Sequence, residues 1–449
     1  MDLPKHILLS VILLASLNSL AQKTKKAVFV IADGISADVL ERMNLSNVKR
    51  ITDKGSYTRM YVGGEKGGYS QTPTISAVGY NSLLTGTWVN KHNVPDNDIK
   101  APNYNYQNIF RLLKTQYPRK KTAIFSSWTD NRTKLLGHKL AAAGNLEVDQ
   151  YFDGYELDTL KFKHDKARDF MHRIDEQVVN QAANTLRTDA PDLSWVYLEY
   201  TDDMGHMYGD SPQFEAAIKK LDVQLGKLYD AIEYRKKSHN EDWLLIITTD
   251  HGRDEQTGKH HGGQSDRQRS TWMVSNYPKL NTYASYFKPA IIDIMPTLAS
   301  YLGVVLPTEI AREVDGIPLI GDVSIAAMEA NYINGYIDLS WKVLNNNGMV
   351  KVWLATTNYF KTGEKDDYHL LTEVPVSKKH FVIDVTKYPS KFYKVVLEAP
   401  GNTANRGLYL ISKNNCEAQF LKREVSSLHM YNMACKILHH EAPQHQGAS

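Results

Sequence analysis

The sequence predicts an α/β fold in which helices sandwich a mostly parallel sheet, followed by a small C-terminal β-sandwich. Three apolar runs have the character of buried strands, and an acidic side chain follows each of them. The runs cover residues 27–32, 193–201 and 243–249, and the acids are Asp33, Asp202 and Asp250. Because the carboxyl ends of parallel strands meet at one edge of a sheet, we expect the three carboxylates to lie close together there.

Helix-like segments alternate with strand-like runs from residue 27 to about residue 325, which is typical of an α/β layer architecture. Residues 36–44 form the first expected helix, and residues 121–128 form a further strand. The clearest helix covers residues 211–238, where apolar residues are spaced alternately by four and three positions, so that one stripe faces the sheet.

The N-terminus has the features of an export signal. Lys5 precedes the apolar run 7–14, and residues 19–21 form a small-x-small cleavage site. We therefore expect a signal peptide over residues 1–21, cleaved before Gln22, and a periplasmic or secreted protein. The apolar run is too short to span a bilayer comfortably and no other stretch looks transmembrane, so no membrane span is expected after cleavage.

A change of pattern near residue 330 marks a second domain. From residue 336 onward the chain reads as short strands separated by Asn- and Gly-containing turns, which favours a β-sandwich. The expected strands cover residues 336–344, 349–355, 380–385, 392–398 and 407–411. The expected division is a signal peptide, a catalytic domain over 22–328, the sandwich over 329–412 and an extension over 413–449. The extension holds Cys416 and Cys435, whose separation leaves open whether they pair.

The composition is that of a folded protein with a large core. Of the 449 residues, 42% are hydrophobic and 23% are charged. The formal net charge of +3 is small, so it gives no support to nucleic acid or an anionic membrane as a partner.

A carboxylate and an imidazole stand close together after the second apolar run. Asp202 precedes His206 by four residues, and nearby glycines would let a loop bring both side chains to one cation. Asp203 competes with Asp202 for this role, and their spacing does not separate them.

The third apolar run ends in the strongest local signal, the adjacent pair Asp250 and His251. A buried strand without a metal would rarely end in two such polar groups together. The following loop carries His260 and His261, and one of them can return to the same centre. The sequence therefore indicates a hard-metal site of aspartate and histidine side chains.

Ser76 is the candidate nucleophile. It begins a helix-like segment, and a hydroxyl in that place ordinarily acts as an N-cap. If a metal lies against it, the hydroxyl can ionise and attack an electrophile. With three carboxylates and three histidines, Ser76 would complete a two-metal hydrolytic centre.

These motifs resemble those of the alkaline phosphatase superfamily, and more narrowly its nucleotide pyrophosphatase/phosphodiesterase branch with its exported bacterial members. The shared features are a first-strand Asp-Gly, a Thr, Ser or Cys nine residues before a Thr-Gly, and then Asp-x-x-Gly-His, Asp-His-Gly and His-Gly. Here they fall at Asp33, Ser76, Asp202, His206, Asp250, His251 and His261. The resemblance spans residues 27 to about 320, and it selects Asp202 over Asp203 and His261 over His260.

The resemblance implies a two-zinc phosphodiesterase or nucleotide pyrophosphatase that acts on a small phosphate ester or a nucleotide through a phosphoseryl intermediate on Ser76. One zinc would be held by Asp33, Asp250, His251 and Ser76. The other would be held by Asp202, His206 and His261, and Asp33 could bridge the two ions. Manganese and iron remain open as alternatives to zinc.

The departures from the family pattern concern the helix after Ser76. Phosphodiesterase members usually place an asparagine three residues after the nucleophile, where this chain has Gly79; Asn81 is the substitute candidate for substrate binding. Val78 and Tyr80 stand where a sulfatase needs proline and arginine, which argues against a sulfatase. A phosphomonoesterase on the same centre is the alternative enzymatic function. The alternative outside the enzymes is a non-catalytic module that binds the cell envelope.

Overall fold

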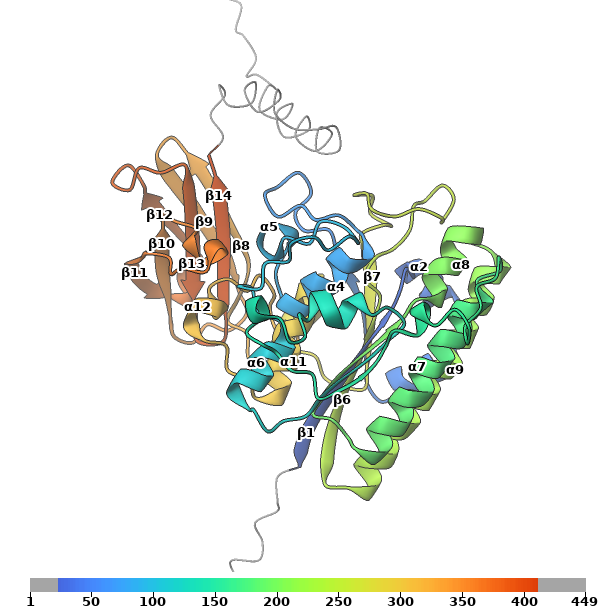
Figure 1. Cartoon of the computed structure of the whole chain (residues 1–449). Helices are drawn as coiled ribbons and strands as arrows, with labels where there is room; N and C mark the ends of the chain where they lie inside the picture. The colour runs from blue at the N-terminus through green and yellow to red at the C-terminus, as the bar shows by residue number, and fades with distance from the viewer. Residues whose placement is uncertain (1–22, 411–449) are drawn as a thin grey trace, which may run out of the picture.

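The computed structural model describes residues 23–410 (Figure 1). The expected signal peptide, the C-terminal extension and both cysteines lie outside these residues. The main domain is built on a seven-stranded sheet in the order β2-β7-β6-β1-β5-β3-β4. Its neighbouring strands pair in parallel except where β7 pairs with β6 and β2, so the prediction of a mostly parallel sheet is confirmed. The strands are β1 (Thr24–Ala32), β2 (Ser56–Tyr61), β3 (Thr122–Ser126), β4 (Gln150–Phe152), β5 (Leu193–Leu198), β6 (Glu241–Thr248) and β7 (Ser270–Ser275).

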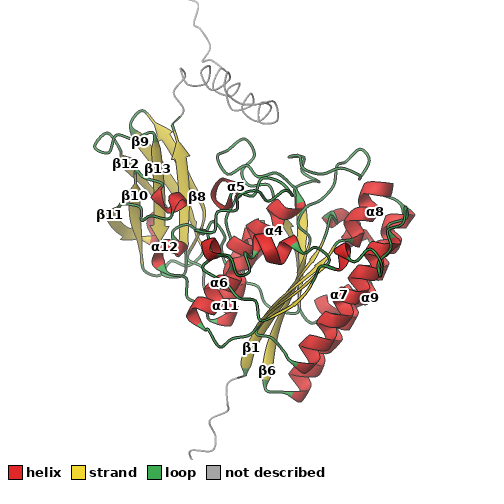
Figure 2. Cartoon of the chain, viewed as in Figure 1, coloured by secondary structure: helices red, strands yellow, loops and turns green. Residues whose placement is uncertain are grey.

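Helices cover both faces of this sheet (Figures 1 and 2). The central strand β1 alternates between the two cores: Phe29 and Ile31 belong to one, and Val28 and Val30 to the other. The first core includes side chains of α4, α6 and α11, and the second includes side chains of α2, α7 and α9. The helices are α2 (Ala37–Arg42), α3 (Ser46–Thr52), α4 (Ser76–Thr85), α5 (Val89–His92), α6 (Ile109–Gln116), α7 (Asp169–Thr188), α8 (Tyr200–Tyr208), α9 (Pro212–Ser238), α10 (Thr282–Tyr286), α11 (Ile294–Leu302) and α12 (Thr308–Ala311).

Helix α9 shows how the sequence specifies one of these elements. Ser211 caps its N-terminus by accepting a hydrogen bond from the backbone N–H of Phe214, and Pro212 follows at the first helical position. The expected apolar stripe is buried in the second core, which confirms its assignment to packing. Its residues are Phe214, Ile218, Leu221, Leu225, Leu228 and Ile232.

The C-terminal domain consists of two antiparallel sheets that enclose a third core, as expected of a small sandwich (Figure 2). Their orders are β11-β10-β13-β14 and β12-β9-β8. The strands are β8 (Ile325–Ile333), β9 (Tyr336–Val343), β10 (Met349–Ala355), β11 (Tyr368–Pro375), β12 (His380–Asp384), β13 (Phe392–Glu398) and β14 (Thr403–Tyr409).

Two of these strands were not among those expected from the sequence, and one of them crosses the expected boundary at residue 329. Strand β8 begins at Ile325, and a register shift between Ala326 and Glu329 breaks the alternation of buried and exposed residues that marks a strand. Strand β11 lies at a sheet edge and buries only Val374, so it carries no alternating apolar pattern.

Among residues 23–410, no helix has both the length and the apolar composition that crossing a bilayer requires.

Candidate metal centre

Three neighbouring strands of the main sheet deliver the predicted ligands to one edge. Asp33 follows β1 directly, and Asp250 follows β6, the neighbour of β1. Strand β5 pairs with β1 on the other side, with Leu198 opposite Ala32 at the strand ends. The chain then enters α8, which carries Asp202 and His206, where the glycines in the sequence had predicted a loop. Because residues four apart share a helix face, α8 presents both side chains to the same region.

The first group of ligands comprises Asp33, Asp250 and His251, whose potential ligand atoms lie within 4.8 Å of one another. His251 Nε2 lies 3.4 Å from Asp33 Oδ1, from Asp250 Oδ2 and from Ser76 Oγ. His251 Nδ1 donates to the backbone oxygen of Gly252 at 3.0 Å, which leaves Nε2 unprotonated and available to a cation. The serine hydroxyl therefore adjoins the first group.

The second group comprises Asp202, His206 and His261. His206 Nε2 lies 3.2 Å from Asp202 Oδ2 and 3.0 Å from His261 Nε2. His261 Nδ1 donates to the backbone oxygen of Thr74 at 2.9 Å, so its Nε2 also faces the group as an acceptor. The rings of His261 and His251 stack with centroids 3.7 Å apart, which brings the two groups side by side.

The competing residues lie elsewhere. The Asp203 carboxylate forms an ion pair with Arg168, whose Nε donates to Asp203 Oδ2 at 2.6 Å. His260 donates its backbone N–H to Asp254 and its side chain belongs to neither group. The geometry therefore brings together the seven residues that the resemblance selected and leaves these two outside.

The electrostatics of the first group favour a bound cation. Burial, with a contribution from Asp202, raises the pKa of Asp33 to about 7. Burial and then Asp33 raise the pKa of Asp250 well above its ordinary value, and burial followed by His261 lowers the pKa of His251. Bringing these carboxylates together in the interior is costly without a positive charge between them.

The second group has a different balance. Burial would raise the pKa of Asp202, but Arg253 and then His206 outweigh it and hold that pKa well below its usual range. The hydrogen bond to Asp202 raises the pKa of His206, and burial lowers the pKa of His261. This group therefore offers an ionised carboxylate and two imidazoles to a cation.

Two buried oxygens support the fit of a metal ion. Asp33 Oδ1 and Asp250 Oδ2 have no hydrogen-bond partner within the described part of the chain. Two ligands held about 2.0–2.2 Å from one ion at a tetrahedral angle are separated by about 3.3–3.6 Å, and the 3.4 Å spacings around His251 Nε2 agree with this value. The residues present fit divalent cations such as zinc, which takes aspartate oxygen and histidine nitrogen.

Side chains that the sequence analysis did not assign to the site hold Asp33 in place. Tyr80 and Tyr197 both donate to Asp33 Oδ2, the latter at 2.8 Å. That oxygen is occupied by two hydroxyls, so Asp33 offers Oδ1 to the first group. Tyr80 stands four residues after Ser76, one helical turn away on α4, which is the signal that could have identified it.

Arg253 holds Asp202 and was also missed, although it follows the Asp250-His251-Gly252 motif directly. Its guanidinium is fully buried, forms an ion pair with Asp202 Oδ1 and donates to the backbone oxygens of Asp202 and Gly34 at 2.8 and 2.7 Å. A side chain at Gly205 would overlap this guanidinium. The glycine of the Asp-x-x-Gly-His motif therefore opens the path along which Arg253 reaches Asp202.

Ser76 is the first residue of α4 and makes no capping hydrogen bond; Asn97 Oδ1 instead accepts from the N–H of Ala77 at 2.9 Å. Gly79 faces Asp250, because a Cβ there would lie 3.0 Å from Asp250 Cβ. Asn81 is five positions after Ser76, and it lies on another face of the helix, where it lines a separate cavity with Thr85. The structure thus does not bring Asn81 to the two ligand groups.

Parts of this chain are similar to known proteins. Residues 27–274 match the family model described as type I phosphodiesterase / nucleotide pyrophosphatase. Venom phosphodiesterase CdcPDE of Crotalus durissus collilineatus is 25% identical over 232 residues, which cover 50% of this chain and 26% of that protein. The 2,3-bisphosphoglycerate-independent phosphoglycerate mutase of Acinetobacter baylyi is 29% identical over 137 residues, covering 30% of this chain and 25% of that protein. The chain thus spans about a quarter of the length of these relatives.

Solved structures with a similar arrangement include a 2-O GAG sulfatase and human ectonucleotide pyrophosphatase/phosphodiesterase 5. The first has a TM-score of 0.48 and 10% identity and covers 81% of this chain and 86% of that chain. The second has a TM-score of 0.45 and 14% identity and covers 63% of this chain and 96% of that chain.

Proposed function

Because this chain belongs to the type I phosphodiesterase/nucleotide pyrophosphatase family, we propose that it is a metal-dependent phosphoric ester hydrolase that cleaves phosphodiesters or nucleotide pyrophosphates. The observation that carries the proposal is the position of Ser76 Oγ, 3.4 Å from His251 Nε2, beside two adjoining groups of Asp and His ligands. A hydroxyl nucleophile next to two such groups suits phosphoryl transfer.

The two groups would hold two zinc ions. Asp33, Asp250, His251 and Ser76 would serve one ion, and Asp202, His206 and His261 would serve the other. Ions in these places would polarise the phosphoryl oxygens and stabilise both the serine alkoxide and the departing oxygen. Because two tyrosines donate to Asp33 Oδ2, Oδ1 is the oxygen that Asp33 would offer to an ion in the first group.

The chain's own residues then carry the reaction in two steps. Ser76 Oγ attacks phosphorus, its proton passes to solvent, and the bond from phosphorus to the leaving oxygen breaks as that oxygen gains a proton from solvent. A phosphoseryl intermediate results. Water then attacks phosphorus, the bond to Ser76 Oγ breaks, and the serine hydroxyl is restored. His251 is fully buried, and its Nε2, 3.4 Å from Ser76 Oγ, keeps the reacting hydroxyl beside the first group of ligands.

Export of the enzyme is part of the proposal. The supporting feature is the basic residue, apolar run and small-x-small site within residues 1–21. N-terminal sequencing of the protein recovered from the cell exterior or the periplasm would be expected to begin at Gln22. Recovery of the uncleaved chain in the cytoplasm would overturn this part.

The activity is tested by a paired rate comparison on the zinc-loaded protein without its signal peptide. The substrates are bis-p-nitrophenyl phosphate, the p-nitrophenyl ester of thymidine monophosphate, p-nitrophenyl phosphate and p-nitrophenyl sulfate. We expect the two diesters to be cleaved fastest, with loss of activity on chelation and recovery with zinc. A dominant monoester rate would make the protein a phosphomonoesterase, a dominant sulfate rate would make it a sulfatase, and inactivity on all four would count against hydrolysis altogether.

A further inference from the structure

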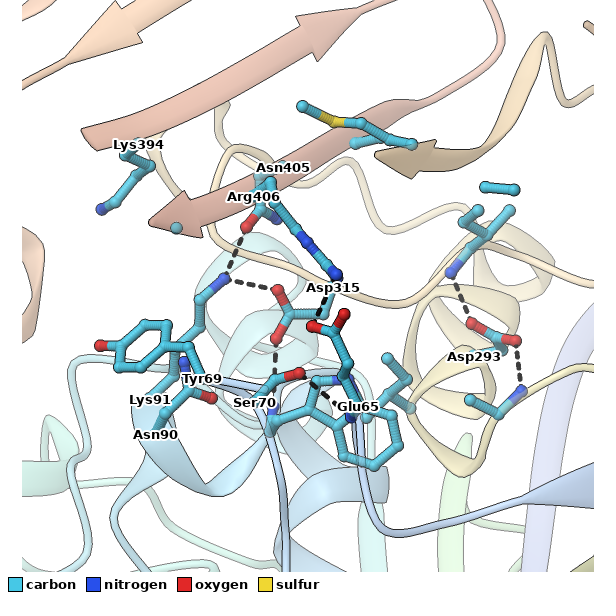
Figure 3. A pocket seen from close by; sticks show the side chains of 18 of the residues that line it. Glu65, Tyr69, Ser70, Asn90, Lys91, Asp293, Asp315, Lys394, Asn405 and Arg406 are labelled. Atoms are coloured by element: carbon cyan, nitrogen blue, oxygen red, sulfur yellow. Dashed lines mark hydrogen bonds and ion pairs between the residues drawn. The ribbon is translucent and has the colours of Figure 1, made fainter. Parts of the chain in front are cut away.

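A cavity of about 210 Å³ lies between the main domain and the C-terminal sandwich, apart from the two ligand groups (Figure 3). The main domain contributes Trp88 and Asn90 to its wall, and the sandwich contributes Phe392, Asn405 and Arg406. Its volume corresponds to roughly seven water molecules at about 30 Å³ each, which is room for a single ring-sized ligand. Clefts between domains are common places for small-molecule sites.

The charged residues of the wall are all matched within the protein. Three carboxylates and three cations line the cavity, so their formal charges cancel. They are Glu65, Asp293, Asp315, Lys91, Lys394 and Arg406.

Each charge has its partner, as Figure 3 shows for several of them. Arg406 Nη2 lies 2.6 Å from Glu65 Oε2, and Lys91 Nζ lies 2.6 Å from Asp315 Oδ1. Asp293 accepts two backbone N–H groups at 2.7 Å. Because Arg406, Lys91 and Lys394 are each paired with a carboxylate, the wall has no unpaired positive charge to offer a phosphate or a carboxylate.

Two of the aromatic side chains that line the cavity, Tyr61 and Trp88, are in contact with each other. Their ring centroids are 6.0 Å apart and their planes are inclined by 32°. Since these rings touch, they leave no slot in which a nucleobase could stack between them. They present a flat apolar patch to one side of the cavity.

The polar wall keeps hydrogen-bonding capacity for a ligand. Asn90 Oδ1 is buried and has no hydrogen-bond partner within the described residues. Buried polar atoms in native structures usually have such a partner. On the same wall, the Ser70 hydroxyl accepts from the N–H of Glu65, and the Asn405 amide accepts from Lys91 and donates to the backbone oxygen of Val314. A ligand with several neutral hydroxyls around its edge would match these groups.

We propose that this interdomain cavity binds a neutral sugar unit, such as one hexose of a glycan. A hexose has an apolar C–H face for the Tyr61–Trp88 patch and hydroxyls that can donate to Asn90 Oδ1. The cavity is distinct from the metal centre, because different residues of the segment 69–74 face the two sites. Tyr69 and Ser70 line the cavity, whereas the Thr74 backbone oxygen holds His261 Nδ1.

Binding of sugars to the full chain tests the proposal by a readout that does not depend on hydrolysis. The probes are glucose, galactose, mannose and N-acetylglucosamine, each measured by calorimetric titration and by saturation-transfer NMR. We expect at least one of them to bind with a Kd on the order of 1 mM, since so small a neutral ligand has few atoms with which to gain affinity. Tyr69→Ala and Asn90→Ala should each weaken that binding by about tenfold or more.

The matched control is Tyr234→Ala, because Tyr234 on α9 is as exposed as Tyr69, at 37%, and lies outside the cavity. It should leave sugar affinity unchanged. The proposal fails if none of the four sugars binds, or if affinity survives in both cavity variants while they remain folded by circular dichroism. It also fails if adenosine, glucuronate or inorganic phosphate binds more tightly than every neutral sugar in a manner that Tyr69→Ala abolishes.

Discussion

The guanidinium of Arg253 passes over Gly205 to reach both the carboxylate and the backbone oxygen of Asp202. Arg253 is fully buried, and a methyl group at position 205 would overlap its guanidinium. One glycine therefore decides whether a buried cation can orient a candidate metal ligand. The relationship links the folding of α8 to the chemistry of the site.

Gly205→Ala should destabilise the protein, because either Arg253 or α8 must move to make room. A displaced or unpaired buried ion pair costs about 3–5 kcal/mol, which exceeds the gain of about 1 kcal/mol from replacing a helical glycine by alanine. Urea unfolding followed by circular dichroism measures the change. The control is Gly154→Ala, where the added methyl meets nothing within 4 Å and only the positive φ opposes it. Equal effects of the two variants would contradict the steric explanation.

Ser76→Ala should remove turnover by at least about 10³-fold while the zinc content stays at the level of the unchanged protein. The reason is that the variant loses the nucleophilic oxygen but keeps the three carboxylates and three histidines. Rates on the diester substrates measure the loss of turnover, and metal analysis of the same sample measures the zinc content. Ser82→Ala on the same helix is the control, since Ser82 binds His92 and the backbone of Val78. Retained turnover with full zinc occupancy would sink the nucleophile assignment.

Tyr197→Phe should lower zinc affinity by about 10–100-fold, the usual cost of losing a partner that orients a ligand. Its hydroxyl donates to Asp33 Oδ2 at 2.8 Å, so the phenylalanine leaves that oxygen with the Tyr80 hydroxyl alone and the carboxylate is held less firmly. Competition with a zinc-binding dye measures the affinity. Tyr106→Phe is a matched control, because the buried hydroxyl of Tyr106 has no hydrogen-bond partner among residues 23–410. Indistinguishable affinities of the two variants would show that Tyr197 does not orient Asp33.

Asp175 predicts a fall in stability as the pH rises. Burial raises its pKa from 3.8 to about 7 although Ser127 and two backbone N–H groups bond it. Since the folded protein holds this proton more tightly than the unfolded chain, the free energy of unfolding falls between about pH 4 and pH 7, by up to ~4 kcal/mol.

In Asp175→Asn the free energy of unfolding should fall less between these pH values, because the asparagine amide does not titrate. Urea unfolding at about pH 5 and about pH 8 measures it. Asp189→Asn, at the exposed C-terminal end of the same helix, serves as the control and should keep the original pH dependence. An unchanged slope in Asp175→Asn would contradict the raised pKa.

Lys394→Met should weaken the attachment of the sandwich to the main domain. Lys394 is 2% exposed and forms ion pairs with Glu313 and, at 2.7 Å, with Asp366. Removing it leaves buried Asp366 without its ion pair and Glu313 with only the longer pair to Lys91, at 3.9 Å, at a cost of about 3–5 kcal/mol. The exposed pair of Lys365 and Glu309, at 2.6 Å, supplies the control Lys365→Met, which should cost no more than about 1 kcal/mol. Similar unfolding curves for both variants would overturn the prediction.

Local patterns in the sequence predicted much of the fold and the candidate residues that the structure brings together. The apolar runs before Asp33 and Asp250 form β1 and β6. Helix α9 was predictable because the residues on its buried face are apolar and recur every three or four positions. Strand β8 was not predicted, because its register shift interrupts the alternation of buried and exposed residues on which the prediction of a strand depends.

The sequence by itself determined the strands that end at the site, the family motifs and the types of candidate ligand, since each depends on residues that are neighbours in the chain. Only the tertiary structure decided which groups orient the ligands: Arg253 reaches Asp202 from 51 residues away, and Tyr197 reaches Asp33 from 164 residues away. It also turned Tyr80 toward Asp33 and left Asn81 on another face of α4. Such contacts depend on how packed elements meet in space, and no local spacing encodes that distance or direction.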